Sequence, residues 1–314
     1  MTRQQFLALL DGITTWKRGG SRAPHKPLLI LLALGRLSRG EPERFAPYDW
    51  YHDALLRLLS DYGPWRKVHH PEMPFWRLQR DGLWDIPEAA GLRRSGKERG
   101  GGVSPRSLRE SGACGGFPQP VFDLLASDAQ LVEIAATRLL VGHFPEGFHD
   151  EIRDAVRLES PLLAAEEPES YAVVRKPRDP AFRRAVITAY ERRCAMCGFD
   201  VRLDDRLLGL EAAHIRWHAC GGPDRVPNGL ALCILHHRAL DRGAVGLRPD
   251  TVSRRATYRL IVSNELSGGS DAFRQLVGIN DQPLRPPQAP HFRPDPQFVR
   301  WHRKEVFRGE PRAA

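Results

Sequence analysis

Two closely spaced pairs of metal-binding residues constrain the fold of this chain more than any other feature. Cys194 and Cys197 are separated by two residues, and Cys233 and His236 repeat that spacing further along the chain. Zinc takes four nitrogen or sulfur ligands in a tetrahedron, and two close pairs are the usual way to supply them. The spacing therefore predicts one structural Zn²⁺ that holds this stretch together as a module.

The same stretch carries three polar residues that a zinc site does not need, namely His214, Asn228 and His237. His214 ends the apolar run LLGLEAAHI, which is typical of a strand, and a second apolar run, GLALC, follows Asn228. The next stretch, ILHHRALDRG, predicts a helix that ends at Gly243.

The adjacent histidines of that helix must serve different sites, because neighbouring side chains on a helix point about 100° apart. We expect His236 to complete the zinc site and His237 to point elsewhere. Asp241 lies four residues after His237 and on the same helix face, so this pair suits a divalent cation. A neutral imidazole at His214 could take a proton from water, which is the work of a general base.

At these residues the chain resembles the HNH, or ββα-metal, endonucleases. The motifs AAHI, GGPDRVPNGLALC and LHHRALDRG carry the resemblance. It implies that His214 activates the attacking water and that Asn228 holds the loop. It also implies that His237 and Asp241 hold the catalytic cation, Mg²⁺ or Mn²⁺, which stabilises charge on the phosphorane and on the leaving 3′ oxygen.

One position departs from the family pattern. Many HNH enzymes have a metal-binding Asp or His immediately before the general base, where this chain has Ala213. Glu211 lies on the same strand face and could substitute through a water molecule. The alternative is a structural zinc module with incidental histidines, but three catalytic-type residues in register with four zinc ligands favour the nuclease.

Length and charge fit a DNA-binding protein of two domains. The chain has 314 residues and a formal net charge of +9, which suits a polyanionic partner. Of five cysteines, only Cys114 and Cys220 remain outside the zinc pattern, too few for a disulfide framework, so we expect a reducing cytoplasm. The N-terminus lacks a signal-peptide pattern, and the longest apolar run, PLLILLALGRL, is too short to span a membrane.

The front of the chain predicts a mainly helical domain. Apolar periodicity predicts helices at TRQQFLALLDGI, KPLLILLALGRLSRG and DWYHDALLRLLSDYG. The stretch PFWRLQRDGLWDIP alternates aromatic and polar residues around Asp81 and Gly82 and predicts a short hairpin. Residues 93–109 carry six basic residues and a run of three glycines. We expect a mobile basic loop there, either solvated or, as we favour, contacting DNA phosphates.

A small apolar group lies at the start of a further predicted helix. Phe117 and Val121 are four residues apart and share one face, with Pro118 beside them. The group predicts either a small surface patch or ordinary core packing.

The front half, through HKPLLILLALGRL, PFWRLQRDGLWDI and GGFPQPVFDLL, followed by an HNH motif, resembles the phosphorothioate-dependent McrA-type restriction endonucleases. In that family a shallow apolar pocket receives the sulfur of a backbone phosphorothioate. By this resemblance the pocket falls on Phe117, Pro118 and Val121. The basic or imidazole donors that the resemblance suggests around it are His69, His70, Lys26 and Arg94.

These observations predict an α+β protein of two domains. We expect a sulfur-binding domain at residues 1–165, a Pro- and Glu-rich linker at 166–180, and an HNH nuclease domain with an extended C-terminal tail at 181–314. The expected activity is cleavage of double-stranded DNA near a phosphorothioate, by a homodimer because a duplex cut needs two active sites.

Two other functions remain open. An HNH enzyme that reads a methylated base would need an aromatic cage or a flipped-base pocket, and the sequence indicates none. A non-catalytic DNA-binding regulator would use zinc for folding only, and His214 and His237 argue against it.

Overall fold

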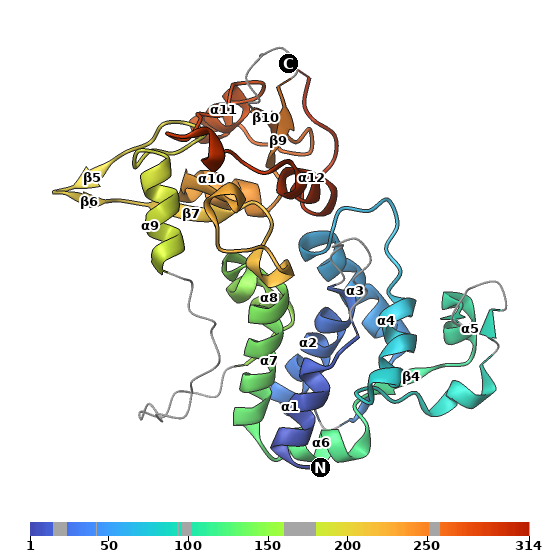
Figure 1. Cartoon of the computed structure of the whole chain (residues 1–314). Coiled ribbons are helices and arrows are strands. Elements are labelled where there is room, and N and C mark those ends of the chain that lie inside the picture. The colour runs from blue at the N-terminus through green and yellow to red at the C-terminus, as the bar shows by residue number, and fades with distance from the viewer. Residues whose placement is uncertain are drawn as a thin grey trace. The chain divides into compact units, whose positions relative to one another are not determined.

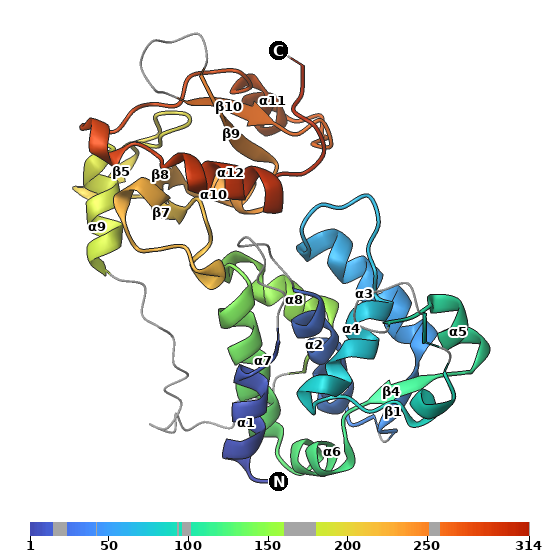
Figure 2. The same ribbon diagram turned by 45° about the vertical axis from the view of Figure 1, so that its right-hand side comes forward.

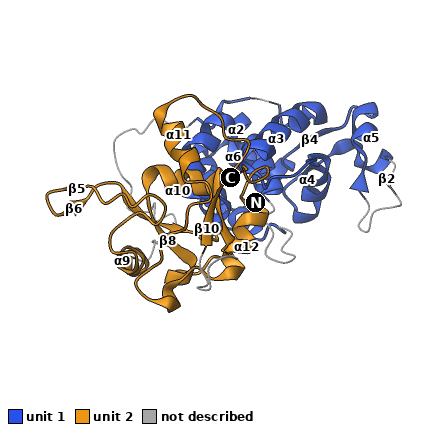
Figure 3. Cartoon of the chain, turned by 90° about the horizontal axis from the view of Figure 1, so that it is seen from above, with its two compact units in different colours: residues 1–174 blue, residues 175–314 orange. Residues whose placement is uncertain are grey.

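The computed structural model describes residues 1–14, 24–41, 43–92, 94–95, 102–159, 180–250 and 258–313. The chain divides into two compact units, Met1–Val174 and Arg175–Ala314 (Figures 1 and 3). Helices predominate and each described sheet has two strands, which agrees with the predicted α+β class. The predicted linker lies outside the described residues except at its last position, so its boundaries stay predictions.

Unit 1 is a helical domain with very short strands. Its elements in chain order are α1 (Arg3–Asp11), α2 (His25–Ser38), β1 (Phe45–Pro47), α3 (Tyr48–Tyr62), α4 (Glu72–Arg77), the 3-10 turns η2 (Leu78–Asp81) and η3 (Pro87–Gly91), β2 (Arg94–Ser95), β3 (Gly102–Val103), α5 (Pro105–Glu110), β4 (Cys114–Gly116), α6 (Gln119–Ala126), α7 (Ala129–His143), η4 (Glu146–Phe148) and α8 (His149–Ala155).

The centre of unit 1 is α2. Every residue from Leu28 to Leu34 is at most 4% exposed, and the helix packs against α3 and α7 (Figure 2). A helix that is apolar on all sides is buried on all sides. The helix predicted at KPLLILLALGRLSRG is therefore confirmed, and it forms the core of this unit.

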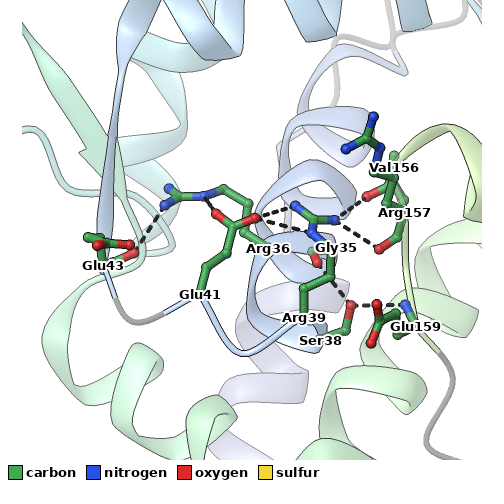
Figure 4. A network of polar contacts seen from close by, with 9 residues as sticks. All are labelled: Gly35, Arg36, Ser38, Arg39, Glu41, Glu43, Val156, Arg157 and Glu159. Atoms are coloured by element: carbon green, nitrogen blue, oxygen red, sulfur yellow. Dashed lines mark hydrogen bonds and ion pairs between the residues drawn. The ribbon is translucent and has the colours of Figure 1, made fainter.

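A close approach joins α2 to the end of α8. A Cβ atom on Gly35 would lie 2.1 Å from the carbonyl oxygen of Val156, so only glycine fits there. Arg39 donates hydrogen bonds to the carbonyl oxygens of Val156 and Arg157 at 3.2 and 2.9 Å (Figure 4). Glu41 holds the same guanidinium at 2.5 Å. These contacts fix the last helix of unit 1 against its core.

Aromatic rings pack around the β1–β4 pair. Phe75 and Trp84 lie edge to face at 5.7 Å, and Trp84 makes the same kind of contact with Phe117 at 6.2 Å. Gly115 of β4 allows this packing, because a Cβ atom there would meet the Phe75 ring at 2.6 Å. The pair therefore leads the chain into α6 with Phe117 already turned into the core.

The hairpin predicted for PFWRLQRDGLWDIP is wrong. Helix α4 continues into the 3-10 turn η2 over this stretch. Gly82 has a left-handed backbone with φ of +72° and ends the turn, so the Asp-Gly pair is a helix terminus and not a hairpin turn. Phe75 and Trp76 are both buried, whereas neighbours on a half-exposed strand point to opposite faces.

The basic segment 93–109 also differs from its prediction at one end. Its C-terminal part forms α5, where the Ser104 side chain accepts a hydrogen bond from the first turn and Pro105 takes the first helical position. Both residues favour helix initiation, and this local signal outweighs the glycines before it. The glycine-containing part, residues 96–101, lies outside the described residues.

Unit 2 combines short antiparallel pairs with helices around one apolar cluster. Its elements are α9 (Pro180–Ala189), β5 (Arg202–Leu203), β6 (Arg206–Leu207), β7 (Leu210–His214), the 3-10 turns η5 (His218–Cys220) and η6 (Val226–Asn228), β8 (Gly229–Cys233), α10 (Ile234–Asp241), β9 (Val245–Pro249), β10 (Tyr258–Val262), α11 (Asp271–Gly278), η7 (Pro290–Phe292) and α12 (Pro296–Glu305).

The hairpin of β7 and β8, followed by α10, holds the candidate site residues, and all three elements are as predicted. Leu210 pairs with Cys233 at one end of the hairpin, and His214 pairs with Gly229 at the other. Strand β8 is wholly buried and leads directly into α10, while α9 packs on both strands. This register places His214 beside Asn228 and keeps the metal-binding cysteine at the opposite end.

The C-terminal segment supports the loop between β7 and β8. Within the tail that was expected to be extended, Pro296–Glu305 form the helix α12, which Asp295 caps. The backbone N–H of Asp295 donates to the carbonyl oxygen of Pro227 at 2.9 Å, and Trp301 lies edge to face with Trp217 at 6.0 Å. Within the described parts of the chain, no helix has the length and apolar character needed to cross a membrane.

Candidate active site and metal centre

The four predicted zinc ligands converge. Cys194 and Cys197 lie after α9, Cys233 caps α10, and His236 lies in its first turn. Their donor atoms are all within 4.8 Å of one another, and Nδ1 of His236 is 3.1 Å from Sγ of Cys233 and 3.7 Å from Sγ of Cys194. Ligands about 2.0–2.3 Å from a tetrahedral zinc lie roughly 3.3–3.8 Å apart, so the donor set and its spacing fit this ion.

The four side chains shift one another's pKa values. Burial disfavours the charged form of His236, but hydrogen bonds with Cys194 and Cys197 outweigh it and raise the pKa of the imidazole to about 9. Hydrogen bonds from Cys197 and Cys233 lower the pKa of the Cys194 thiol. Among the described residues, this is the one group of three or more Cys, His, Asp or Glu side chains whose donor atoms meet in this way.

His237 points away from that centre and lies between two carboxylates. Its Nδ1 is 2.6 Å from Oε2 of Glu211 in β7, and its Nε2 is 3.4 Å from Oδ2 of Asp241. His237 and Asp241 are buried, whereas Glu211 is half-buried. A cation at Nε2 would therefore have Asp241 beside it, while Glu211 contacts the opposite nitrogen of the ring directly. The expectation that Glu211 replaces the missing ligand at Ala213 through a water molecule stays a prediction.

Asn228 is fully buried and ties together the loop between β7 and β8. Its Oδ1 accepts a hydrogen bond from the Arg216 N–H at 2.9 Å, and its Nδ2 donates to the carbonyl oxygens of Arg216 and Pro223, both at 3.0 Å. Gly222 lies inside this closure, since a Cβ atom there would be 1.8 Å from the Arg216 carbonyl oxygen. The geometry suits the loop-holding role that the HNH resemblance implies.

His214 is held on its face and on its edge. Its ring stacks on Phe182 of α9 with centroids 4.3 Å apart and planes 17° from parallel. Its Nε2 lies 2.7 Å from Oδ1 of Asp224, and 12% of its side chain is exposed. The ring is therefore fixed at the end of β7 while keeping some access to solvent.

Asp224 and Phe182 are site residues that no pattern in the sequence marks. Phe182 is a buried apolar residue of α9, so its stacking on a histidine distant in sequence has no local signal. Asp224 follows Gly222 and Pro223 in the loop, and its contact with His214 depends on the closure that Asn228 makes. The motif GGPDRVPN held this residue, but its spacing does not show where the carboxylate points.

The residues predicted to line a sulfur pocket lie around the start of α6. Phe117 and Val121 are 2% and 0% exposed, whereas Pro118, the residue that caps α6, is partly exposed. The three do not form a common surface patch, because two of them pack into the core. Pro118 is the one of the three that a ligand outside the domain can reach.

A further basic residue, Arg44, lies beside them. Arg44 donates to the carbonyl oxygen of Phe117 at 3.1 Å and lies over the ring of Phe45 at 3.8 Å. It also pairs with Asp85 at 3.2 Å. Arg44 and Phe117 line a small cavity together with Arg36.

Two of the predicted donors have other engagements or lack a described side chain. Lys26 donates to Oδ2 of Asp81 at 2.5 Å and to the carbonyl oxygen of Thr14 at 3.0 Å, and 14% of its side chain is exposed. These contacts tie α2 to the end of η2. Arg94 lies in β2, and its side chain is outside what the structure describes.

The two predicted histidine donors precede α4. His70 is exposed, and its Nδ1 lies 2.9 Å from Oε1 of Glu72 in the first turn of that helix. His69 is partly exposed. His70 therefore lies at the surface of unit 1 with its ring oriented by Glu72, and His69 lies partly at the surface beside it.

Two protein families match this chain, one after the other along its length. The family described as "ScoMcrA-like, DNA sulfur-binding domain" matches residues 3–161, just over half of the chain. The chain belongs to this family. Its second half carries an HNH endonuclease domain, because that family matches residues 194–248, from the first zinc ligand into β9. The HNH match therefore covers the four predicted zinc ligands, the candidate general base and the candidate cation-binding residues.

Several solved structures resemble the sulfur-binding part of this family member. The sulfur-binding domain of ScoMcrA complexed with phosphorothioated DNA is 26% identical with a TM-score of 0.42, over 48% of this chain and 94% of that one. The type IV phosphorothioation-dependent restriction endonuclease ScoMcrA is 27% identical with a TM-score of 0.37, over 43% of this chain but 29% of that one. The sulfur-binding domain of SprMcrA with phosphorothioated DNA is 23% identical with a TM-score of 0.40. A search of curated proteins returned no match.

Proposed function

We propose that this chain is a modification-dependent restriction endonuclease that recognises phosphorothioated double-stranded DNA and hydrolyses phosphodiester bonds near the modification. The observation that carries the proposal is the presence of a DNA sulfur-binding domain and an HNH endonuclease domain in one chain. The net charge of +9 suits a polyanionic duplex. Two solved relatives of the first domain hold phosphorothioated DNA.

In the proposed reaction, His214 acts as general base. The neutral ring takes a proton from water, the resulting hydroxide oxygen attacks phosphorus, and the bond from phosphorus to the 3′ oxygen breaks. The backbone carbonyl of Asn228 accepts a hydrogen bond from the N–H of Ile215 at 2.8 Å, so the residue after the base is tied to the loop. Asn228 thereby keeps the base and the loop in register.

We assign the catalytic cation to Nε2 of His237 and to Asp241. A bound Mg²⁺ or Mn²⁺ supplies stabilisation of negative charge on the phosphorane and on the leaving oxygen. Carboxylate oxygen and imidazole nitrogen are suitable ligands for such ions. Glu211 orients the His237 ring through Nδ1. Carboxylates that contact the non-ligating nitrogen of a metal-binding histidine commonly have this role.

We assign a structural Zn²⁺ to Cys194, Cys197, Cys233 and His236. All four protein ligands are close enough to fill a tetrahedral shell and leave no open position, which distinguishes structural from catalytic zinc. The site joins the segment after α9 to the junction of β8 and α10. It therefore stabilises the hairpin that carries His214 without taking part in the chemistry.

Sulfur recognition is assigned to Pro118, supported from below by Phe117 and Val121. A phosphate oxygen pressed against an apolar surface loses its water without a replacement, a penalty of about 1–3 kcal/mol. Sulfur is a poorer hydrogen-bond acceptor, so it loses less, and it gains dispersion contact. The difference corresponds to roughly tenfold to hundredfold discrimination.

The phosphates around the sulfur need basic or imidazole donors. His69, His70 and Arg94 are the donors that we propose, and they would supply salt-dependent affinity for modified and unmodified DNA alike. Lys26 has the least support among the predicted donors, because Asp81 already binds its ammonium group. We place the protein in the cytoplasm, where its DNA substrate is found.

We also propose a homodimer, held by an apolar surface of unit 2. Its residues are Val201, Leu203, Leu208, Ile234 and Leu235, which are 44–67% exposed. Large exposed apolar side chains favour an interaction site, and the β5–β6 hairpin, which carries Leu203, projects from the domain (Figure 1). A second copy suits this surface, because the same hairpin carries two arginines and two aspartates that can pair across a twofold axis.

The dimer is tested by sedimentation velocity of the full chain. Leu203→Lys should convert a dimer to a monomer, whereas Val68→Lys, at a similarly exposed apolar position in unit 1, should not. A parental protein that sediments as a monomer at the concentrations used for cleavage would overturn this part of the proposal.

The activity is tested with one phosphorothioated duplex and the full chain in Mg²⁺ or Mn²⁺. The parental protein should cut it, and His214→Ala should bind it with similar affinity but not cut. Cutting by His214→Ala at the parental rate would refute the assignment of the base, and absence of parental cutting in both cations would refute the proposed function.

A further inference from the structure

The carboxylate of Asp224 lies where it can control the ring of His214. The distance from Nε2 of His214 to Oδ1 of Asp224 is 2.7 Å, with 12% and 27% of the two side chains exposed. The other carboxylate oxygen is 3.8 Å from Nε2 of His218, a residue with 42% exposure. The shorter contact to the less exposed ring makes His214 the main partner of this carboxylate.

The loop holds Asp224 in this position from the residue before it. The carbonyl oxygen of Pro223 accepts hydrogen bonds from Nδ2 of Asn228 and from the N–H of Arg225, both at 3.0 Å. Asn228 is fully buried, and its hydrogen bond therefore holds the Pro223 carbonyl group in place. Asn228 thus fixes Pro223, which precedes Asp224 in the chain, and Asp224 in turn contacts His214.

We propose that Asp224 is the positioning residue of the general base, an inference that rests on the proposed nuclease function. An ionised carboxylate can only accept, so the ring nitrogen that faces it must carry the hydrogen. Nε2 of neutral His214 is therefore the N–H donor, and the lone pair lies on Nδ1. A proton taken from water goes to Nδ1, and the carboxylate then stabilises the imidazolium that forms.

Phe182 completes the arrangement from the face of the ring. The stacking at 4.3 Å blocks rotation of the imidazole out of the plane set by the carboxylate. Asn228 consequently has two effects in this site, since it closes the loop and delivers the carboxylate that fixes the base. Neither effect requires Asp224 to touch DNA or a metal ion.

The experiment compares the full-length parental protein with Asp224→Asn and with Asp271→Asn. Asp271 is a surface residue with an 84% exposed side chain in the first turn of α11, so it controls for loss of one charge. Asp224→Asn should lower the single-turnover cleavage rate by about 10²- to 10⁴-fold, the usual contribution of a positioned general base. Its affinity for the duplex and its zinc content should equal those of the parental protein, because the substitution affects the His214 ring and not the residues that bind DNA or zinc.

A second readout reports the ring itself. Two-bond proton–nitrogen NMR correlations of isotope-labelled histidine distinguish the two neutral tautomers, and His214→Gln identifies the signals of this residue. The parental ring should be the Nε2–H tautomer, and Asp224→Asn should lose that preference. An Nδ1–H ring in the parental protein would overturn the inference, whether or not the variant folds.

The outcomes separate this inference from the proposed function. A parental protein that cuts while Asp224→Asn cuts equally fast refutes the positioning role and leaves the nuclease intact. A parental protein that does not cut refutes the proposed function. The NMR measurement then still shows whether Asp224 fixes the tautomer of the His214 ring.

Discussion

Oε2 of Glu211 lies 2.6 Å from Nδ1 of His237, while Asp241 approaches the other nitrogen of the same ring at 3.4 Å. A carboxylate on one nitrogen of a metal-binding imidazole fixes the ring and increases the basicity of the other nitrogen. Ala213 provides no ligand at the position that usually does so in HNH enzymes. Glu211 contributes its carboxylate from two residues earlier on the same strand face.

Glu211→Ala should weaken binding of Mn²⁺ by about tenfold to hundredfold, the usual effect of removing a carboxylate that orients a metal-binding histidine. Titration of Mn²⁺ followed by electron paramagnetic resonance measures this affinity without a cleavage assay. Zinc content should not change, because Glu211 contacts His237 and not His236. Glu310→Ala removes an exposed carboxylate of the same unit and is the control. Unchanged Mn²⁺ affinity in the Glu211 variant would contradict the assignment.

Cys194→Ser should lose the zinc ion and cooperative thermal unfolding of unit 2 together, since structural zinc contributes folding free energy directly. Elemental analysis and a thermal melt measure the two effects. Cys220→Ser is the matched control, because this partly exposed cysteine of η5 is not among the four converging ligands. Parental protein that stays folded and zinc-free after chelation would be incompatible with the site.

Pro118→Asp should erase the preference for phosphorothioated over unmodified DNA, because it brings a carboxylate against the phosphate. Pro118 caps α6, and aspartate is a favoured residue at that position, so the fold should tolerate the change. Binding of the full chain to both duplexes, followed by fluorescence anisotropy, gives the ratio of affinities. Val121→Asp is a poor probe by comparison, since Val121 is fully buried and the charge should unfold unit 1. Retention of full preference by Pro118→Asp would place the pocket elsewhere.

The stability of unit 1 should fall in mild acid through His149. Burial lowers the pKa of this imidazole, although the carbonyl oxygen of Phe144 at 3.1 Å partly opposes the effect. A histidine whose pKa is lower in the folded than in the unfolded state contributes stability at pH values above its ordinary pKa of about 6.5. This contribution is lost as the pH falls through the pKa of the folded state. Urea denaturation at several pH values should show a smaller loss for His149→Gln than for the parental protein. Equal slopes would exclude this residue as a source.

The nuclease half was more predictable from sequence than the front half, for a physical reason. Its zinc ligands lie in short fixed spacings, and the strands and helix around His214 have local periodicity. The contacts of Asp224 and Glu211 depend instead on how the loop closes and how α10 crosses β7, which spacing does not show. In the front half, Gly82 ends a helix where a turn was expected. The burial of Phe117 follows from Trp84, a residue distant in sequence.

The central claim is that the chain cuts DNA because the DNA carries a backbone sulfur. The most direct test is a competition in one tube between two duplexes of equal sequence and distinguishable length, one of which carries a single phosphorothioate of defined stereochemistry. The ratio of the two initial cleavage rates is independent of enzyme concentration and of the fraction of active protein. We expect a ratio of at least about tenfold in favour of the modified duplex, for one of the two stereoisomers. A ratio of one for both stereoisomers would contradict it.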